Sequence, residues 1–255
     1  MSEYEPGSEP EGGVSDALPQ GRAAELAGRL AAVRARVEAA AAAAGRDAAG
    51  ISVVVVTKTY PASDVRLLAG LGVADVGESR DQEASAKAAE CAGLPLRWHF
   101  VGRLQSNKAR SVAGYAHAVH SVDRKSLVRP LSRGAVAAGR QVGVFVQVSL
   151  DGDPARGGVV RDGLPALADA VAAADGLELA GLMAVAPLGA DPDAAFAPLA
   201  DLSGALREAH PDAWRISAGM SGDLEAAVRA GATHLRVGSA VLGERPPLEY
   251  RPNGG

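Results

Sequence analysis

Cysteine is nearly missing from this chain of 255 residues, in which Cys91 stands alone. A single cysteine excludes a disulfide within the chain and is typical of a reducing compartment. The flanking sequence AKAAECAGLP is rich in alanine and predicts the end of a helix. We therefore interpret Cys91 as a buried structural thiol rather than a nucleophile.

Long apolar runs and blocks of one charge are missing as well. No stretch approaches the ~20 apolar residues that a membrane span requires, and the acidic start MSEYEPGSEPEGG does not resemble a signal peptide. The net charge of −4 gives no reason to expect nucleic acid or an anionic membrane as a partner. These absences predict a soluble, cytoplasmic protein.

The chain divides into a short tail and one folded domain. Residues 1–19 are rich in Glu, Pro, Gly and Ser, which predicts a disordered tail. Apolar residues then recur at helical spacing from Gly21 to Gly45, where the glycine is a natural helix C-cap. No linker follows, so we expect a single domain over residues 20–250.

Eight short apolar segments, rich in β-branched residues, recur after this helix. They are ISVVVVTK (51–58), VADVGES (73–79), LRWHFVG (96–102), AHAVHSVD (116–123), GVFVQVSL (143–150), LELAGLMAVAP (177–187), WRISAGMS (214–221) and THLRVGSAVLG (233–243). Segments of helical period separate them, and this alternation indicates parallel strands covered on both faces. Eight units within about 200 residues favour the α/β class and a single (β/α)8 TIM barrel with an extra N-terminal helix. The absence of GxGxxG after the first strand and of GxxxxGK[ST] weakens the nucleotide-binding folds.

Polar residues gather where the predicted strands end, which is where barrels place their chemistry. Lys58 follows four consecutive valines, so its stem should begin in the barrel wall. Desolvation in such a site disfavours the ammonium form, and a neutral amine attacks a carbonyl to give a Schiff base. A solvated rim charge is the plainer alternative for a lysine at a strand end.

The segments ISAGMSGDLEAAV and LRVGSAVLG predict an anion site. Barrels often bind phosphate with the loops after strands seven and eight, where glycines such as Gly219 and Gly238 let backbone N–H groups approach. We expect Ser221 to be the N-cap of a helix that begins near Gly222. The alternative is that these glycines only ease tight turns.

A Schiff-base lysine opposite a phosphate cradle describes pyridoxal 5'-phosphate (PLP), with the aldehyde on Lys58 and the phosphate in the cradle. Arg236, on the last strand, would then face the pyridine ring. An arginine there would keep the ring nitrogen unprotonated, because two adjacent cations repel. A neutral ring is a poorer electron sink.

The motifs VTKTYP, VGESRDQE, WHFVGRLQSNK, HSVD, GLMAVAP, ISAGMSGD and LRVGSAVLGER, in that order, resemble the pyridoxal phosphate homeostasis protein family. The resemblance runs from about residue 22 to 246. It implies a barrel like the N-terminal domain of alanine racemase, with PLP on Lys58, phosphate on Ser217, Gly238 and Ser239, and Arg236 toward the ring nitrogen. It also implies cofactor holding, buffering or delivery, with PLP-requiring apoenzymes as candidate partners, and no catalytic residues.

This chain departs from the family pattern in three places. Ser79 stands where the family usually has Asn, so a contact to the cofactor is expected to be lost or bridged by water. Ala218 replaces a methionine, and VLGER replaces IFGxR.

Two enzyme hypotheses compete with the carrier. A PLP-dependent racemase of the same barrel type would need a second domain, and only about a dozen residues follow Gly243, so we expect an open site that lacks a second acid or base. A Schiff-base aldolase shares the lysine and the phosphate site but usually carries its lysine on a mid-barrel strand. We interpret His99 and His120 as packing residues, and expect no bound metal and a monomer.

Overall fold

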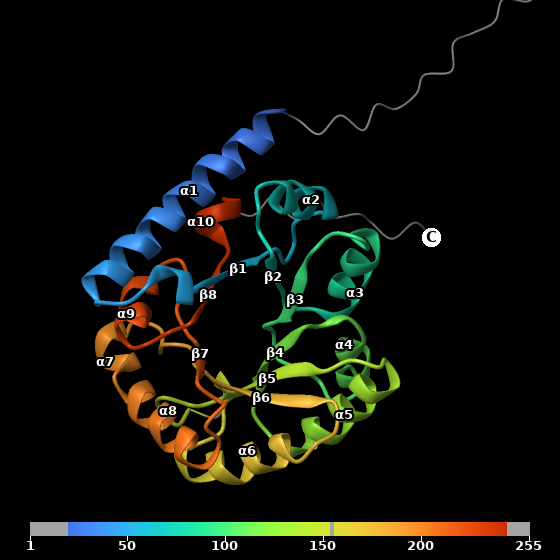
Figure 1. Cartoon of the computed structure of the whole chain (residues 1–255), viewed down its shortest axis with the longest axis vertical. Coiled ribbons are helices and arrows are strands. Elements are labelled where there is room, and N and C mark those ends of the chain that lie inside the picture. The colour runs from blue at the N-terminus through green and yellow to red at the C-terminus, as the bar shows by residue number, and fades with distance from the viewer. Residues whose placement is uncertain (1–19, 154–155, 244–255) are drawn as a thin grey trace, which may run out of the picture.

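Eight parallel strands close into a barrel in which each strand pairs with its neighbours in the sequence and β8 pairs with β1 (Figure 1). The computed structural model describes residues 20–153 and 156–243, so the tail predicted for residues 1–19 lies outside the described residues. The strands are β1 (Ser52–Val56), β2 (Asp75–Glu78), β3 (Arg97–Phe100), β4 (Ala118–Val122), β5 (Val142–Gln147), β6 (Leu177–Met183), β7 (Arg215–Ser217) and β8 (His234–Val237). Seven of them lie within the predicted segments, β5 begins one residue before its segment, and the predicted barrel is confirmed.

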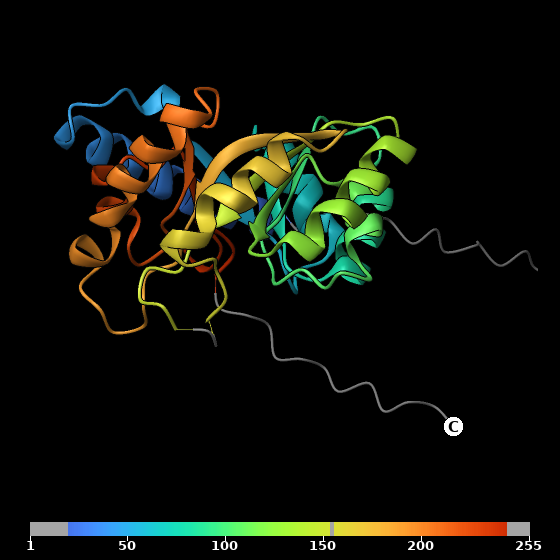
Figure 2. The ribbon, with the colours of Figure 1, turned by 90° about the horizontal axis from the view of Figure 1, so that it is seen from below.

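Helices form the outer layer and alternate with the strands along the chain (Figure 1). They are α1 (Gln20–Ala43), α2 (Ala62–Gly70), α3 (Asp81–Glu90), α4 (Ala109–Tyr115), α5 (Val128–Ala137), α6 (Leu164–Ala172), α7 (Pro192–Phe196), α8 (Pro198–Ala209), α9 (Leu224–Arg229) and α10 (Ser239–Leu242). Short 3-10 turns lie at η1 (Ala48–Gly50), η2 (Lys125–Leu127) and η4 (Arg161–Gly163). Figure 2 shows from the side how these helices wrap the strands.

The predicted N-terminal helix is present as α1, which lies along the outside of the barrel beside α9 and α10 (Figure 1). Its apolar stripe, including Leu26 and Val33, is buried. Arg22 pairs with Asp64 of α2 at 2.7 Å, and so fastens the helix to the barrel. The helix therefore covers the closure of the barrel, where the last strand meets the first.

The core has two parts of different character. A large apolar layer lies between the helices and the strands, and a small cluster of Ala118, Phe145, Ala180 and Met183 lies apart from it. Buried polar residues on the strands include His99, His120, Ser217 and Arg236. Buried polar groups need hydrogen-bond partners, and the partners of these four turn out to be one another.

Candidate functional site

A pocket lies at the C-terminal ends of the strands. The described residues that line it are Val56, Lys58, Tyr60, Ser79, Val101, Gly102, Met183, Val185, Met220, Ser221, Gly222, Arg236, Gly238, Ser239 and Gly243. The pocket thus brings together Lys58, Ser79, Arg236, Gly238 and Ser239 from the residues predicted to bind the cofactor. Ser217 and Gly219 do not line it, and each instead contacts Arg236.

Lys58 reaches this pocket from a tight turn that follows β1. Thr57 N donates to the Gly77 carbonyl at 2.8 Å and continues the strand ladder by one residue, and Tyr60 N donates back to Thr57 O at 3.1 Å. Thr59 has φ 70°, unique among the described non-glycine residues in being positive. A β-branched residue in this region is strained. This strained residue directly follows Lys58 in the turn.

A buried charge pair holds the backbone of this turn in place. Glu78, at the end of β2, accepts from Thr57 Oγ1 at 2.6 Å and from Lys87 Nζ at 2.8 Å. Lys87 Nζ also donates to Thr57 O at 2.8 Å, and thus holds the backbone next to Lys58. Burial raises the pKa of Glu78, although the bonds from Lys87 and Thr57 act in the opposite direction. Lys87 was not among the predicted site residues; its position four residues after Glu83 on an alanine-rich helix was the available signal.

Arg236 lines the pocket and is 5 % exposed. Its Nη1 donates to Ser217 Oγ at 2.6 Å, its Nη2 donates to Ala184 O at 3.0 Å, and its backbone N donates to Gly219 O at 2.9 Å. Burial lowers its pKa to about 10, and no carboxylate in the described part of the chain pairs with it. A buried guanidinium of this kind suits a ligand with an acceptor atom or negative charge.

Two serine hydroxyls face each other on the far side of the pocket. Ser239 Oγ donates to Ser221 Oγ at 3.4 Å, and Ala240 N donates to the same oxygen at 3.3 Å. The predicted role of Ser221 as a cap for the following helix is wrong. That helix, α9, begins at Leu224 with Asp223 at its N-cap position, so Ser221 is free to turn toward the start of α10.

Gly219 shapes the turn that carries Ser221. Its φ is 88°, and a Cβ added there would lie 2.6 Å from the Cβ of Ala227 on α9. Both the backbone conformation and the close packing require glycine. The residue predicted to bind phosphate therefore has a clear packing role as well.

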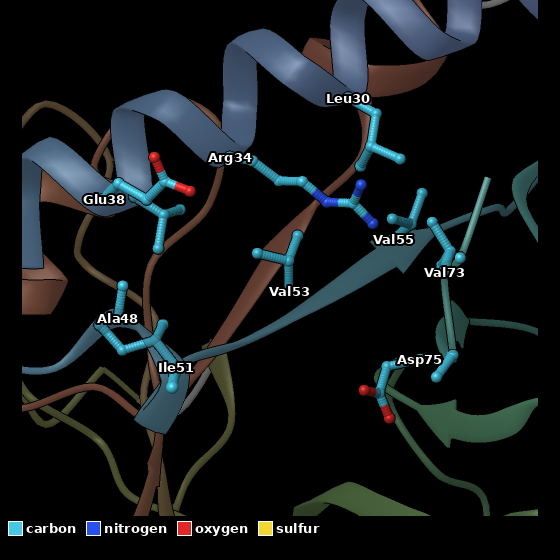
Figure 3. A pocket seen from close by; sticks show the side chains of 13 residues that line it. Leu30, Arg34, Glu38, Ala48, Ile51, Val53, Val55, Val73 and Asp75 are labelled. Atoms are coloured by element: carbon cyan, nitrogen blue, oxygen red, sulfur yellow. The ribbon is translucent and has the colours of Figure 1, made fainter.

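A second hollow lies on the outer surface, between α1 and the strands β1 and β2 (Figure 3). Its lining is mainly apolar, with Arg34 reaching from α1 toward β1 and Asp75 at its lower edge (Figure 3). No paired acid and base and no lysine at a strand end occur among its described lining residues. This hollow therefore lacks the residues predicted for Schiff-base formation, whereas the pocket that contains Lys58 has them.

Comparison with known proteins agrees with this geometry. The alanine racemase N-terminal domain family matches residues 29–246, which defines the class of barrel. A pyridoxal phosphate homeostasis protein of Mycobacterium tuberculosis is 48% identical over 244 residues, covering 88% of this chain and 94% of that protein. One from Escherichia coli is 34% identical over 227 residues, covering 87% and 97%. The chain belongs to the pyridoxal phosphate homeostasis protein family.

A solved structure of a relative includes the cofactor. PipY of Synechococcus elongatus, with PLP bound, superimposes with a TM-score of 0.73 at 35% identity, covering 86% of this chain and all (100%) of that one. The resemblance drawn from the sequence motifs is thus confirmed. Within residues 20–153 and 156–243, no helix has both the length and the apolar character needed to cross a membrane.

Proposed function

We propose that this protein binds PLP covalently through Lys58 and holds it for delivery, as part of PLP homeostasis, without turning over substrates efficiently. The observation that carries the proposal is the convergence of Lys58, Arg236 and Ser239 on one pocket. The cofactor supplies an aldehyde, a phosphate and a ring nitrogen, and the pocket supplies an amine, paired hydroxyls and a guanidinium donor. The relative PipY was solved with PLP bound, which supports PLP as the ligand.

Each residue has a distinct part in this proposal. The neutral amine of Lys58 would condense with the aldehyde of PLP to a C=N bond, and the aldehyde oxygen would leave as water with the two amine protons. Ser239 and Ser221, with the glycine backbone at Gly238, hold the phosphate through hydrogen bonds. Arg236 donates toward the ring nitrogen and keeps it unprotonated, because a second cation beside a guanidinium is unfavourable. Ser79 offers one short hydroxyl where the family usually has an amide.

A carrier fits the pocket better than a racemase does. Racemisation needs proton transfer on both faces of the substrate carbon, and therefore an acid or base opposite the lysine. Among the described lining residues, the titratable side chains are Lys58, Tyr60 and Arg236. Tyr60 is buried, and its hydroxyl donates to Gly243 O at 2.9 Å. The described pocket therefore lacks the second group, and we expect negligible alanine racemisation.

We further propose that the PLP is passed to PLP-requiring apoenzymes, that the protein acts as a monomer, and that it works in the cytoplasm, where the free, buried thiol of Cys91 would stay reduced. Size-exclusion chromatography with light scattering tests the monomer.

Borohydride reduction of the purified protein tests the covalent bond. We expect visible absorbance before reduction, loss of that absorbance with hydroxylamine, and a phosphopyridoxyl adduct on the peptide that contains Lys58. An adduct on Lys108 or Lys125 would show that the assignment is wrong. Alanine racemisation at a few turnovers per second, which is ordinary for an enzyme, would contradict the carrier.

A further inference from the structure

A chain of buried hydrogen bonds crosses the barrel interior and ends on Arg236. It starts at Asp75, the first residue of β2, whose Oδ1 lies 2.8 Å from His99 Nε2. His99 Nδ1 lies 2.8 Å from His120 Nε2, and His120 Nδ1 lies 2.7 Å from Ser217 Oγ. Arg236 Nη1 then donates to Ser217 Oγ at 2.6 Å. All five residues are at most 7 % exposed.

The far end of this chain is a carboxylate held by a surface cation. Arg97, whose side chain is 51% exposed, donates from Nε and Nη2 to the two oxygens of Asp75 at 2.7 and 2.6 Å. Burial would raise the pKa of Asp75, but the bonds from Arg97 and His99 outweigh it and hold the pKa below its usual range. Asp75 is therefore an ionised group that only accepts hydrogen bonds. It lies at the edge of the outer hollow (Figure 3).

This acceptor fixes the first bond, in which His99 donates its Nε2–H to Asp75. For the rest of the chain we take His99 in its neutral form, which accepts at Nδ1 from the Nε2–H of His120. His120 then accepts at Nδ1 from the hydroxyl of Ser217. The Ser217 oxygen is then left to accept from Arg236. In every bond of the chain the donor therefore lies on the Arg236 side and the acceptor on the Asp75 side.

The surroundings of His120 favour its neutral form. The residue is 0% exposed, and its ring stacks on Phe145 with centroids 4.3 Å apart. Burial, with the cation of Arg236 adding to it, lowers its pKa well below the usual value. The nearby rings are those of His99 and His234, with centroids 5.0 and 6.2 Å away. An uncharged His120 fits the direction derived above.

We propose that His99 and His120 are positioning residues that connect the Asp75 carboxylate to Arg236 and so hold the guanidinium donors toward the bound cofactor. The inference rests on the proposed function, because it concerns the same pocket. Arg236 has no carboxylate of its own in the described part of the chain. Successive hydrogen bonds polarise one another, so the chain makes Ser217 a stronger acceptor than an isolated serine. Two fixed acceptors, Ser217 and Ala184 O, then set the plane of the guanidinium.

Asp75→Asn in the PLP-loaded protein tests the connection, because the change is nearly isosteric and lies four hydrogen bonds from Arg236. We expect the dissociation constant for PLP to rise about tenfold, as happens when a residue that supports a directly bound group is lost. We also expect the absorbance maximum of the bound cofactor to shift. His120→Phe, which breaks the chain but keeps an aromatic ring, should do the same. Asp169→Asn is the matched control, since Asp169 pairs with His210 at 2.9 Å at the surface.

The spectrum separates positioning from a purely structural role. A structural role would lower the melting temperature and leave the spectrum and affinity of the remaining folded protein unchanged. If Asp75→Asn and His120→Phe both fold and bind PLP with the wild-type affinity and absorbance maximum, the proposal is overturned.

Wild-type protein provides a second test that needs no variant. The derived bond directions require His99 and His120 both to be neutral with the proton on Nε2, which 15N NMR of the imidazole rings reports directly. A proton on Nδ1 of His120 would reverse the chain and overturn the proposal. The tautomers can be read without cofactor, so a missing Lys58 adduct would contradict the proposed function alone.

Discussion

Ser217 Oγ lies 2.6 Å from Arg236 Nη1, and this contact joins the lining of the pocket to the polar interior of the barrel. Ser217 is fully buried and does not line the pocket, whereas Arg236 does. Ser217 therefore affects a ligand through the guanidinium that it holds. Its predicted role as a phosphate ligand stays a prediction.

Ser217→Ala should weaken both folding and cofactor retention. The variant leaves Arg236 Nη1 and His120 Nδ1 without their partner, and an unsatisfied buried group costs about 1–3 kcal/mol of unfolding free energy. We expect this loss in urea denaturation of the cofactor-free protein, and about tenfold weaker PLP binding. Ser203→Ala on α8 is the control, because Ser203 is also buried but lies outside the pocket lining. Equal effects of the two variants would contradict the role of Ser217.

Ser239→Ala should weaken cofactor retention with little effect on folding. The hydroxyl donates only a long bond, 3.4 Å, to Ser221, so its loss costs the free protein little. A hydrogen bond to a phosphate contributes about 1.5–3 kcal/mol, and we therefore expect at least about tenfold weaker binding. Equilibrium dialysis against free PLP measures it, with the surface variant Ser132→Ala as control. Unchanged affinity in both Ser239→Ala and Arg236→Ala would place the phosphate elsewhere.

Local patterns were sufficient to predict the barrel and the rim of its pocket. The valine run that forms β1 predicts both the strand and the emergence of Lys58, because a strand buried on both faces is continuously apolar. Parallel strands end at one face of a barrel, so Lys58, Ser79 and Ser239, which follow strands, and Arg236, near the end of β8, could be placed together.

Partners distant in the sequence could not be predicted in this way. His120 and Ser217 are 97 residues apart, and their contact depends on strand register and on side-chain rotamers across the barrel. A histidine within an apolar strand indicates burial but not what it bonds to. The N-cap assignment of Ser221 was wrong because the helix begins two residues later than predicted, at Leu224, with Asp223 at the N-cap position.

The stability of the protein should fall as the pH falls from 7 to 5. Burial lowers the pKa of His234 to about 3, that of His120 well below its usual value, and that of His117 as well. In the unfolded chain histidine titrates near ~6.5, so below that pH the unfolded state binds more protons and is favoured. His234, whose pKa lies below this whole range, should remove about 2 kcal/mol of unfolding free energy by pH 5, and His120 and His117 act in the same direction. The raised pKa of Glu78 has the opposite effect on stability, but it is a single group against three histidines.

Urea denaturation at several pH values measures this trend. His234→Gln should flatten the dependence because it removes one of the three histidines, and His210→Gln at the surface is the control. Unfolding free energy that is constant or increases from pH 7 to 5 would contradict the assignment of these histidines as neutral.

Lys87→Met should destabilise the protein more than Glu78→Gln does. Removing the lysine leaves the Glu78 carboxylate, 1% exposed, with only the Thr57 hydroxyl, and an uncompensated buried charge costs about 3–5 kcal/mol. With Glu78→Gln, Lys87 keeps Glu83 at 2.7 Å and Thr57 O at 2.8 Å. Denaturant midpoints of the two variants give the order, and the reverse order would show that Glu83 rather than Glu78 is the main partner of Lys87.

Gly102→Ala should disturb the pocket itself. A Cβ added at Gly102 would lie 2.1 Å from the carbonyl oxygen of Ser79, and both residues line the pocket. Either the turn after β2 or the turn after β3 must move, which we expect to cost about 1–3 kcal/mol as overpacking does and to weaken PLP binding. Gly114→Ala is the matched control, because nothing lies within 4 Å of the added Cβ on α4, and alanine is favoured by about 0.5–1 kcal/mol within a helix. Calorimetry and PLP titration of both variants separate the effects. Wild-type stability and affinity in Gly102→Ala would mean that the Ser79 turn yields easily and does not determine the shape of the pocket.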